Sequence, residues 1–241
     1  MTGVVAGVDG CPMGWAVVFR RPDGSQEPVF AVVETFAAIL DHPLRPEIIA
    51  VDMPIGLPER IGRSGRGPEQ AVRPHLGERQ SSVFAVPSRA AVMEADYRRS
   101  CAVAQATSDP PKKVSKQCFN LFPKIREIDA LMTRALEARV YECHPELGFW
   151  RLNGERAMRL PKKAKSRVNP AGLDERRDLL VRHGYDPAFL TAPLPRGVGA
   201  DDRLDAAVLA LIAAWIAAGE AESFPPQPER DGKGLRMAIW A

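Results

Sequence analysis

The chain has 241 residues, 45% hydrophobic and 26% charged, so it is long enough to bury a core without disulfides or structural metals. It has no apolar run of the roughly 20 residues needed to cross a bilayer, and its first ten residues lack the basic start of a signal peptide. We therefore expect a cytoplasmic protein without a membrane partner; the oligomeric state is left open.

The net charge is only +3, but the charges are unevenly distributed. Residues 110–182 hold 17 Lys and Arg against 9 Asp and Glu. Such an excess is typical of a surface that binds a polyanion such as nucleic acid, DNA or RNA. A solvated basic surface would show the same excess, so charge alone does not decide between the two.

The first 58 residues predict a mixed sheet. Residues 4–9 form a nearly continuous apolar run that ends in an acid and a Gly/Pro turn, as expected for a buried central strand. Residues 48–52 repeat this plan. Between them the pattern predicts strands at 15–20 and 27–33, joined by a turn at 22–25, and a short helix capped by Thr35. Strands on both sides of one helix favour an α/β fold with a mixed sheet.

The remainder of the chain predicts helices and one more strand. Residues 59–90 are rich in Gly, Pro, Arg and Ser and are expected to be irregular. We expect no second domain: residues 1–241 form one domain with an insertion at about 59–137. Helices are predicted at 90–106, 115–139 (interrupted near Pro123), 174–183 and 202–218, a strand at 140–143 and a basic loop at 161–170.

Three acids stand at the ends of predicted strands. Asp9 and Asp52 each close an apolar strand immediately before a turn, and Glu142 follows Val140 on a third strand. The carboxyl ends of strands in open α/β sheets are where ligands bind, and an unpaired buried charge is very costly. One strand-end Asp is often only a turn former. Two on neighbouring strands indicate a site.

The last predicted helix adds two further acids. Asp202 and Asp205 are three residues apart and share a helix face that continues through Leu209 and Ile212 toward the core. Asp201 is expected to be the helix N-cap. Asp205, a full turn inside the helix, is not explained by capping. Carboxylates that converge in one cleft need cations, and oxygen-only ligands suit Mg²⁺ or Mn²⁺. Two such ions can cleave a phosphodiester by hydrolysis.

Motifs along most of the chain resemble the domain-of-unknown-function family 429, which is described as predicted RNase H-like nucleases. The resemblance implies an RNase H-like mixed five-stranded sheet with flanking helices and an inserted helical and irregular segment. The matching motifs lie at 8–15, 51–58, 76–84, 115–117, 123–125, 142–146, 201–206 and 234–236.

The wider superfamily implies roles for individual residues. Holliday-junction resolvases carry an Asp on the first strand, an acid on the fourth, and an Asp-x-x-Asp pair on the last helix. Asp9, Asp52, Asp202 and Asp205 match this plan as metal ligands, although Asp52 stands where Glu is more usual. Glu142 has no counterpart there and is retained as a candidate catalytic acid, and His144 is a candidate general base. Candidate phosphate or nucleic-acid contacts are Arg79, Ser81, Ser82, Lys116, Lys124, Lys162 and Lys163.

The resulting prediction is a nuclease, a hydrolase that depends on Mg²⁺ or Mn²⁺. Two alternatives remain open. One is a non-catalytic nucleic-acid- or protein-binding module that has kept the fold. The other is an actin-like enzyme that binds nucleotide phosphates; this is disfavoured because the chain has neither a second Asp-Gly strand nor a GxxxxGK[ST] loop.

Overall fold

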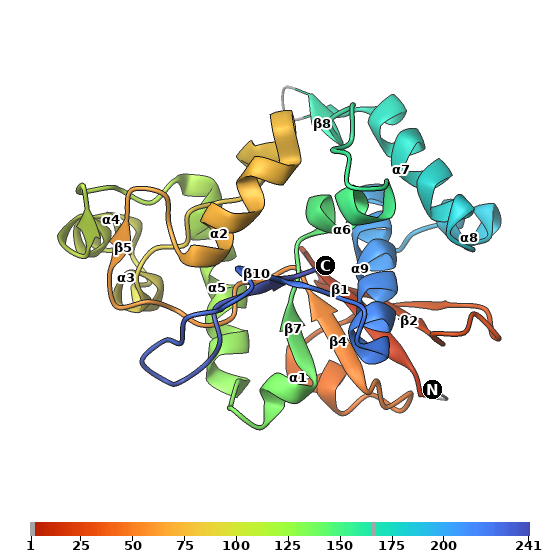
Figure 1. The fold of residues 1–241 in the computed structure, drawn as a ribbon, viewed down its shortest axis with the longest axis horizontal. Coiled ribbons are helices and arrows are strands. Elements are labelled where there is room, and N and C mark those ends of the chain that lie inside the picture. The colour runs from red at the N-terminus through yellow and green to blue at the C-terminus, as the bar shows by residue number, and fades with distance from the viewer. Residues whose placement is uncertain (1–2, 165–166) are drawn as a thin grey trace.

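The computed structural model describes residues 3–164 and 167–241, and at its centre lies a five-stranded mixed sheet of order β3-β2-β1-β4-β7 (Figure 1). β1 pairs antiparallel with β2 and parallel with β4, and β4 pairs parallel with β7. This topology confirms the α/β prediction and is consistent with an RNase H-like fold. The strands are β1 (Val5–Cys11), β2 (Gly14–Arg20), β3 (Val29–Val33), β4 (Ile48–Val51) and β7 (Val140–Glu142).

Helices cover both faces of the sheet, and two separate cores result. Successive side chains of a strand point to opposite faces, so Val5 of β1 packs in the core under α9, whereas Ala6 and Val8 pack in the core under α5. α1 lies with α5. The helices outside the insertion are α1 (Phe36–Leu40), α6 (Pro145–Leu152), α7 (Pro170–Arg182), α8 (Pro187–Thr191) and α9 (Ala200–Ala218).

α9 packs directly on β1 because Gly7 has no side chain. A Cβ at Gly7 would stand 2.1 Å from both the Ala206 carbonyl oxygen and the Ala210 nitrogen. The helix is buried almost all round, from Arg203 to Ala214, instead of showing the single apolar stripe expected from the sequence. This close approach brings the first turns of α9 to the carboxyl end of β1.

The segment between β4 and β7 forms a lobe at one side of the sheet, opposite α7 and α8 (Figure 1). The stretch 59–90 was expected to be irregular, but it contains an α-helix and 3-10 turns at Arg73–Ser82 that are interrupted by a kink at Gly77. The lobe consists of β5 (Ile61–Gly62), α2 (Gly67–Val72), the 3-10 helix η1 (Arg73–Ser82), α3 (Arg89–Met93), α4 (Tyr97–Ala106), β6 (Ser108–Asp109), α5 (Lys116–Leu131) and the 3-10 helix η2 (Leu136–Ala138).

Several predicted boundaries were wrong. The helix predicted at 90–106 is two helices, and α5 runs through Pro123 without a break because its buried residues on both sides, Phe122 and Ile125, anchor it to the core. Asp201 is not the N-cap of α9: Gly199 is, and Asp202 accepts a hydrogen bond from the Gly199 nitrogen at 2.8 Å.

Short strand pairs complete the fold. The basic loop predicted at 161–170 forms one such pair in part; Lys165 and Ser166 of that loop lie outside the described residues. The pairs are β8 (Lys163–Ala164) with β9 (Arg167–Val168), and β10 (Ser223–Phe224) with β11 (Ile239–Trp240). None of the helices in the described ranges is long and apolar enough to cross a membrane.

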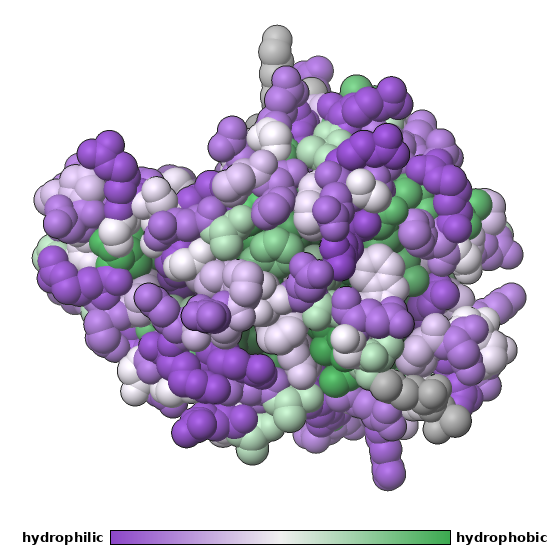
Figure 2. Space-filling view, in the orientation of Figure 1, coloured by the Kyte–Doolittle hydropathy of each residue, from purple (hydrophilic) through white to green (hydrophobic). Residues whose placement is uncertain are grey.

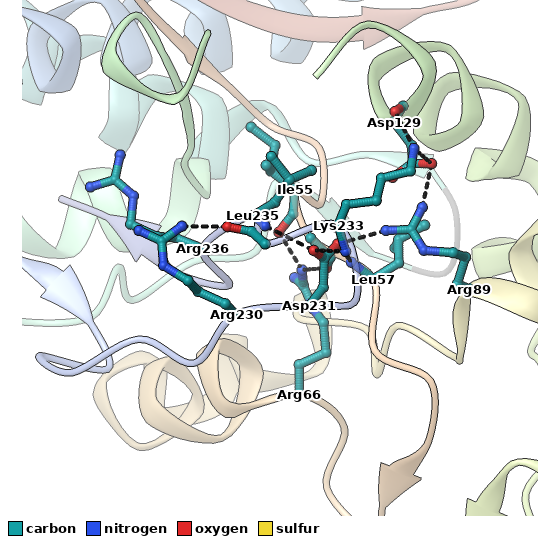
Figure 3. A network of polar contacts seen from close by, with 12 residues as sticks. Ile55, Leu57, Arg66, Arg89, Asp129, Arg230, Asp231, Lys233, Leu235 and Arg236 are labelled. Atoms are coloured by element: carbon teal, nitrogen blue, oxygen red, sulfur yellow. Dashed lines mark hydrogen bonds and ion pairs between the residues drawn. The ribbon is translucent and has the colours of Figure 1, made fainter. Parts of the chain in front are cut away.

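Asp231 ties the C-terminal segment to the lobe and to the turn after β4 (Figure 3). Its Oδ2 accepts hydrogen bonds from the Leu57 nitrogen at 2.9 Å and from Arg89 at 2.6 Å, and its Oδ1 accepts from the nitrogens of Lys233 and Leu235. Arg89 also pairs with Asp129 of α5. The network therefore fixes the turn that directly follows Asp52.

On the face seen in Figure 2, apolar side chains show in small groups between hydrophilic ones.

Candidate active site

Asp9 and Asp52 lie side by side because of the strand register. Val8 of β1 pairs with Val51 of β4, and the Asp52 nitrogen donates to the Val8 carbonyl at 2.9 Å. Asp9 follows Val8 and Asp52 follows Val51, so the two acids are neighbours near the ends of two parallel strands. By the alternation of strand side chains, Asp9 follows Val5 and Gly7 toward α9. Two carboxylates thus meet at the end of the sheet that α9 covers.

α9 brings Asp202 and Asp205 to the same place. All four aspartates line one cleft of about 680 Å³, together with residues of η1, α6 and the loop at 161–163. Asp205 is 5% exposed, and its Oδ1 is buried without a hydrogen-bond partner in the described structure. The four sequence-predicted metal ligands, taken from two strands and one helix, therefore converge.

Lys162 supplies the cation nearest to these acids. Its ammonium donates to Asp205 and lies 3.9 Å from Glu146 of α6. Glu146 in turn accepts from the fully buried Arg176 of α7 at 2.7 Å on both oxygens, and Arg176 also donates to the Leu160 carbonyl at 2.9 Å. This chain of contacts holds the Lys162 loop over the cleft.

The acids are held in an environment that disfavours their charge. Burial raises the pKa of Asp9 well above its ordinary value, and the neighbouring Asp205 and Asp52 raise it further. Burial raises the pKa of Asp52 and of Asp205 to about 6, with Lys162 opposing the shift in both. Burial also raises the pKa of Asp202. One ammonium is therefore not enough to neutralise the cluster, and further positive charge would be stabilised there.

Glu142 is not among the residues that line the cleft of the four aspartates, although it lines a smaller cavity of about 120 Å³ with Asp9 and Asp52. It pairs in register with Val51, whose side chain faces the α5 core, so Glu142 points to the opposite face of the sheet from Asp52. Its Oε1 bonds Arg66 at 2.5 Å, and its Oε2 accepts from Arg66 at 3.1 Å and from the Ile55 nitrogen at 2.7 Å. Burial raises the pKa of Glu142 to about 7 although Arg66 opposes the shift. The carboxylate holds the turn that follows Asp52.

Five of the seven predicted phosphate contacts line the same cleft: Arg79, Ser81, Ser82, Lys162 and Lys163. Lys163 is half exposed and pairs with Asp201 at 2.6 Å.

Lys116 and Lys124 do not line the cleft. The Lys116 ammonium lies 4.0 Å from the centre of the Tyr97 ring, and Lys124 lies over Trp15 and donates to the Gly14 carbonyl. Both side chains are engaged with aromatic rings of the protein, which the sequence did not reveal.

His144 and Glu146 are cleft residues that enter with α6. His144 has a buried Nδ1 with no hydrogen-bond partner in the described structure, and burial lowers its pKa, which favours the neutral ring. Glu146 was part of a quoted motif but was not predicted as a site residue. Its position in the first turn of α6, directly after the strand that carries Glu142, is the signal that could have indicated it.

The donor chemistry of the cleft fits Mg²⁺ or Mn²⁺, since four aspartates offer oxygen ligands and Asp205 has a buried, unpartnered oxygen. As the side chains stand, no group of three or more His, Cys, Asp or Glu within residues 3–164 and 167–241 could hold a metal ion. The ammonium of Lys162 bonds Asp205 instead. A divalent ion at Oδ2 of Asp205 therefore requires Lys162 to move, whereas Oδ1 has no partner to displace.

Comparison with known proteins matches the sequence to one family. Residues 7–230 match the family described as "Protein of unknown function (DUF429)". The chain belongs to the DUF429 family. No curated protein and no solved structure matches the chain. The DUF429 match covers the lobe, nearly all of the sheet and the four aspartates predicted as metal ligands, so the cleft lies within the matched part of the chain.

Proposed function

We propose that this protein is a divalent-metal-dependent nuclease, with Mg²⁺ or Mn²⁺ as cofactor and DNA or RNA as substrate. The observation that carries the proposal is the convergence of Asp9, Asp52, Asp202 and Asp205 in one cleft where burial raises the pKa of every one of them. Acids in such a place are stabilised by bound cations.

In this proposal the four aspartates would hold the ion or ions, which would supply Lewis acidity toward a phosphodiester oxygen. Arg79 and Lys163, both at the cleft, contact the phosphates on either side and position the backbone without reading its sequence. His144, kept neutral by burial, accepts at its unpartnered Nδ1 the proton of the water that attacks the phosphodiester. Glu142 is a positioning residue that acts through Ile55 and the turn after Asp52.

The test is cleavage of labelled branched DNA, single-stranded DNA and RNA with Mn²⁺, Mg²⁺ or EDTA, with ATP hydrolysis measured in parallel. We expect at least one substrate to be cut with metal and none with EDTA. Tight binding of nucleic acid without cleavage in any metal would contradict the proposal and favour the non-catalytic binding module. ATP hydrolysis without cleavage would favour the actin-like alternative.

The contact of Lys162 with Asp205 favours the non-catalytic binding module as a second candidate. An ammonium bonded to a proposed metal ligand neutralises that ligand in place of a metal ion. If Lys162 competes with a metal ion, Lys162→Met should strengthen Mn²⁺ binding by about tenfold, because a buried carboxylate then lacks its cation. The readout is the rise in melting temperature on adding Mn²⁺, which is expected to be larger in Lys162→Met than in the wild type.

Lys116→Met is the matched control, because Lys116 does not line the cleft and its ammonium lies over the Tyr97 ring instead. It should leave the Mn²⁺-induced rise unchanged. Equal rises in all three proteins would show that Lys162 and the ion do not share a site.

A further inference from the structure

A second cavity lies within the lobe, and we call it the basic groove. It measures about 480 Å³ and is formed by the β5 turn, η1 and the segment after it, and the stretch that leads into α5. Four cationic side chains line it, and no Asp or Glu is among its described lining residues. The cations are Arg63, Arg73, Lys112 and Lys113.

No residue in the described ranges neutralises the positive charge of Arg63, Lys112 and Lys113 in this groove. Arg63, Lys112 and Lys113 are exposed, and their side chains make no hydrogen bond or ion pair in the described part of the chain. Arg73 is held by carbonyl groups only, those of Val83 at 3.1 Å and of Ser64. The groove therefore presents a field that attracts anions, and the N-terminus of the 16-residue helix α5 at Ser115 adds to it.

The basic groove is continuous with the acidic cleft. Ser81 and Phe84 line both cavities, so a chain lying in the groove passes these two residues to reach the aspartates. The wall between the cations is apolar, with Ile61, Val83 and Val114 beside the half-buried ring of Phe84. A single-stranded nucleic acid presents alternating phosphates and bases. Cations bind the phosphates, and an aromatic, apolar surface binds the bases.

We propose that this groove binds the backbone of a single-stranded polynucleotide segment on one side of the phosphate presented to the aspartates. The inference rests on the proposed nuclease function and assigns it a substrate class, a strand that is unpaired next to the scissile bond. The phosphates contact Arg63, Lys112 and Lys113, and a base stacks on Phe84 where the groove meets the cleft.

The test is binding of fluorescein-labelled oligothymidine or oligouridine of about 15 nucleotides, measured by anisotropy in EDTA. The triple variant Arg63→Ala/Lys112→Ala/Lys113→Ala should raise the Kd about tenfold or more. The slope of log Kd against log salt should fall by about 2, because three phosphate contacts are lost. The two probes distinguish DNA from RNA.

The matched control removes three exposed arginines that do not line the groove: Arg45→Ala/Arg134→Ala/Arg182→Ala. It should bind like the wild type. Equal Kd values for the groove variant and the control would overturn the inference, and so would a duplex probe that binds as tightly as the single strand. If the groove variant binds weakly while the wild type cleaves nothing in any metal, the groove stands and the nuclease proposal fails.

Discussion

Asp9→Asn is expected to reduce metal-dependent cleavage by a factor on the order of 10³ while the protein stays folded. Asn keeps the shape of the side chain and its oxygen can still accept the hydrogen bond from the Gly10 nitrogen, which Asp9 accepts at 2.8 Å. It removes the negative charge that faces Asp52 and Asp205. Because burial and those neighbours raise the pKa of Asp9, its ionised form is unfavourable without cations. The melting temperature in EDTA should therefore not fall.

Asp205→Asn should have the same effect on cleavage, and Asp41→Asn, an exposed aspartate after α1, is the control that should change neither rate nor melting temperature. Initial cleavage rates and thermal unfolding in EDTA are the two measurements. Full turnover in both Asp9→Asn and Asp205→Asn would show that the aspartate cleft is not the catalytic site.

Arg66→Met is expected to have the largest effect on stability, lowering the free energy of unfolding by about 3–5 kcal/mol. The guanidinium is fully buried and bonds two buried carboxylates, Glu142 and Glu69, and the carbonyls of Ile55 and Gly56. Removing it leaves two buried acids without their cation and frees the turn that follows Asp52. Urea unfolding at neutral pH measures the loss.

Two further variants show whether unpaired charge causes that loss. Arg151→Met removes an arginine whose partners Glu155 and Glu222 are exposed, and it should change stability by less than about 1 kcal/mol. Adding Glu142→Gln to Arg66→Met should restore part of the loss, since one buried charge is then gone. If Arg66→Met is no worse than Arg151→Met, the Glu142–Arg66 contact does not support the turn.

Three aspartates of the cleft could be predicted from the sequence because each breaks a local rule. Asp9 and Asp52 end apolar strands, and Asp205 stands on the inward face of a helix, where an unpaired charge is costly. Local patterns are enough to detect such exceptions. The mixed α/β sheet also followed from the alternation of strands and helices, and the structure confirms it.

What the sequence did not predict depends on long-range geometry. The direction of Glu142 follows from the register of β7 against β4, which pairs residues more than 80 positions apart. The contact of Lys162 with Asp205 requires a loop placed by Arg176 and Glu146. Asp231 bonds Arg89 across 142 positions. Local periodicity does not contain such pairings. The continuity of α5 through Pro123 also depends on tertiary packing, which overrides the local tendency of proline to interrupt a helix.

The most direct test of the claim that the cleft aspartates bind a divalent metal ion is a crystal structure of the protein soaked in Mn²⁺, with data collected for the anomalous signal of manganese. We expect a manganese peak between the carboxylates of β1, β4 and α9, and the ammonium of Lys162 displaced from Asp205. A soaked crystal with no manganese at these three elements, and with Lys162 still bonded to Asp205, would contradict it.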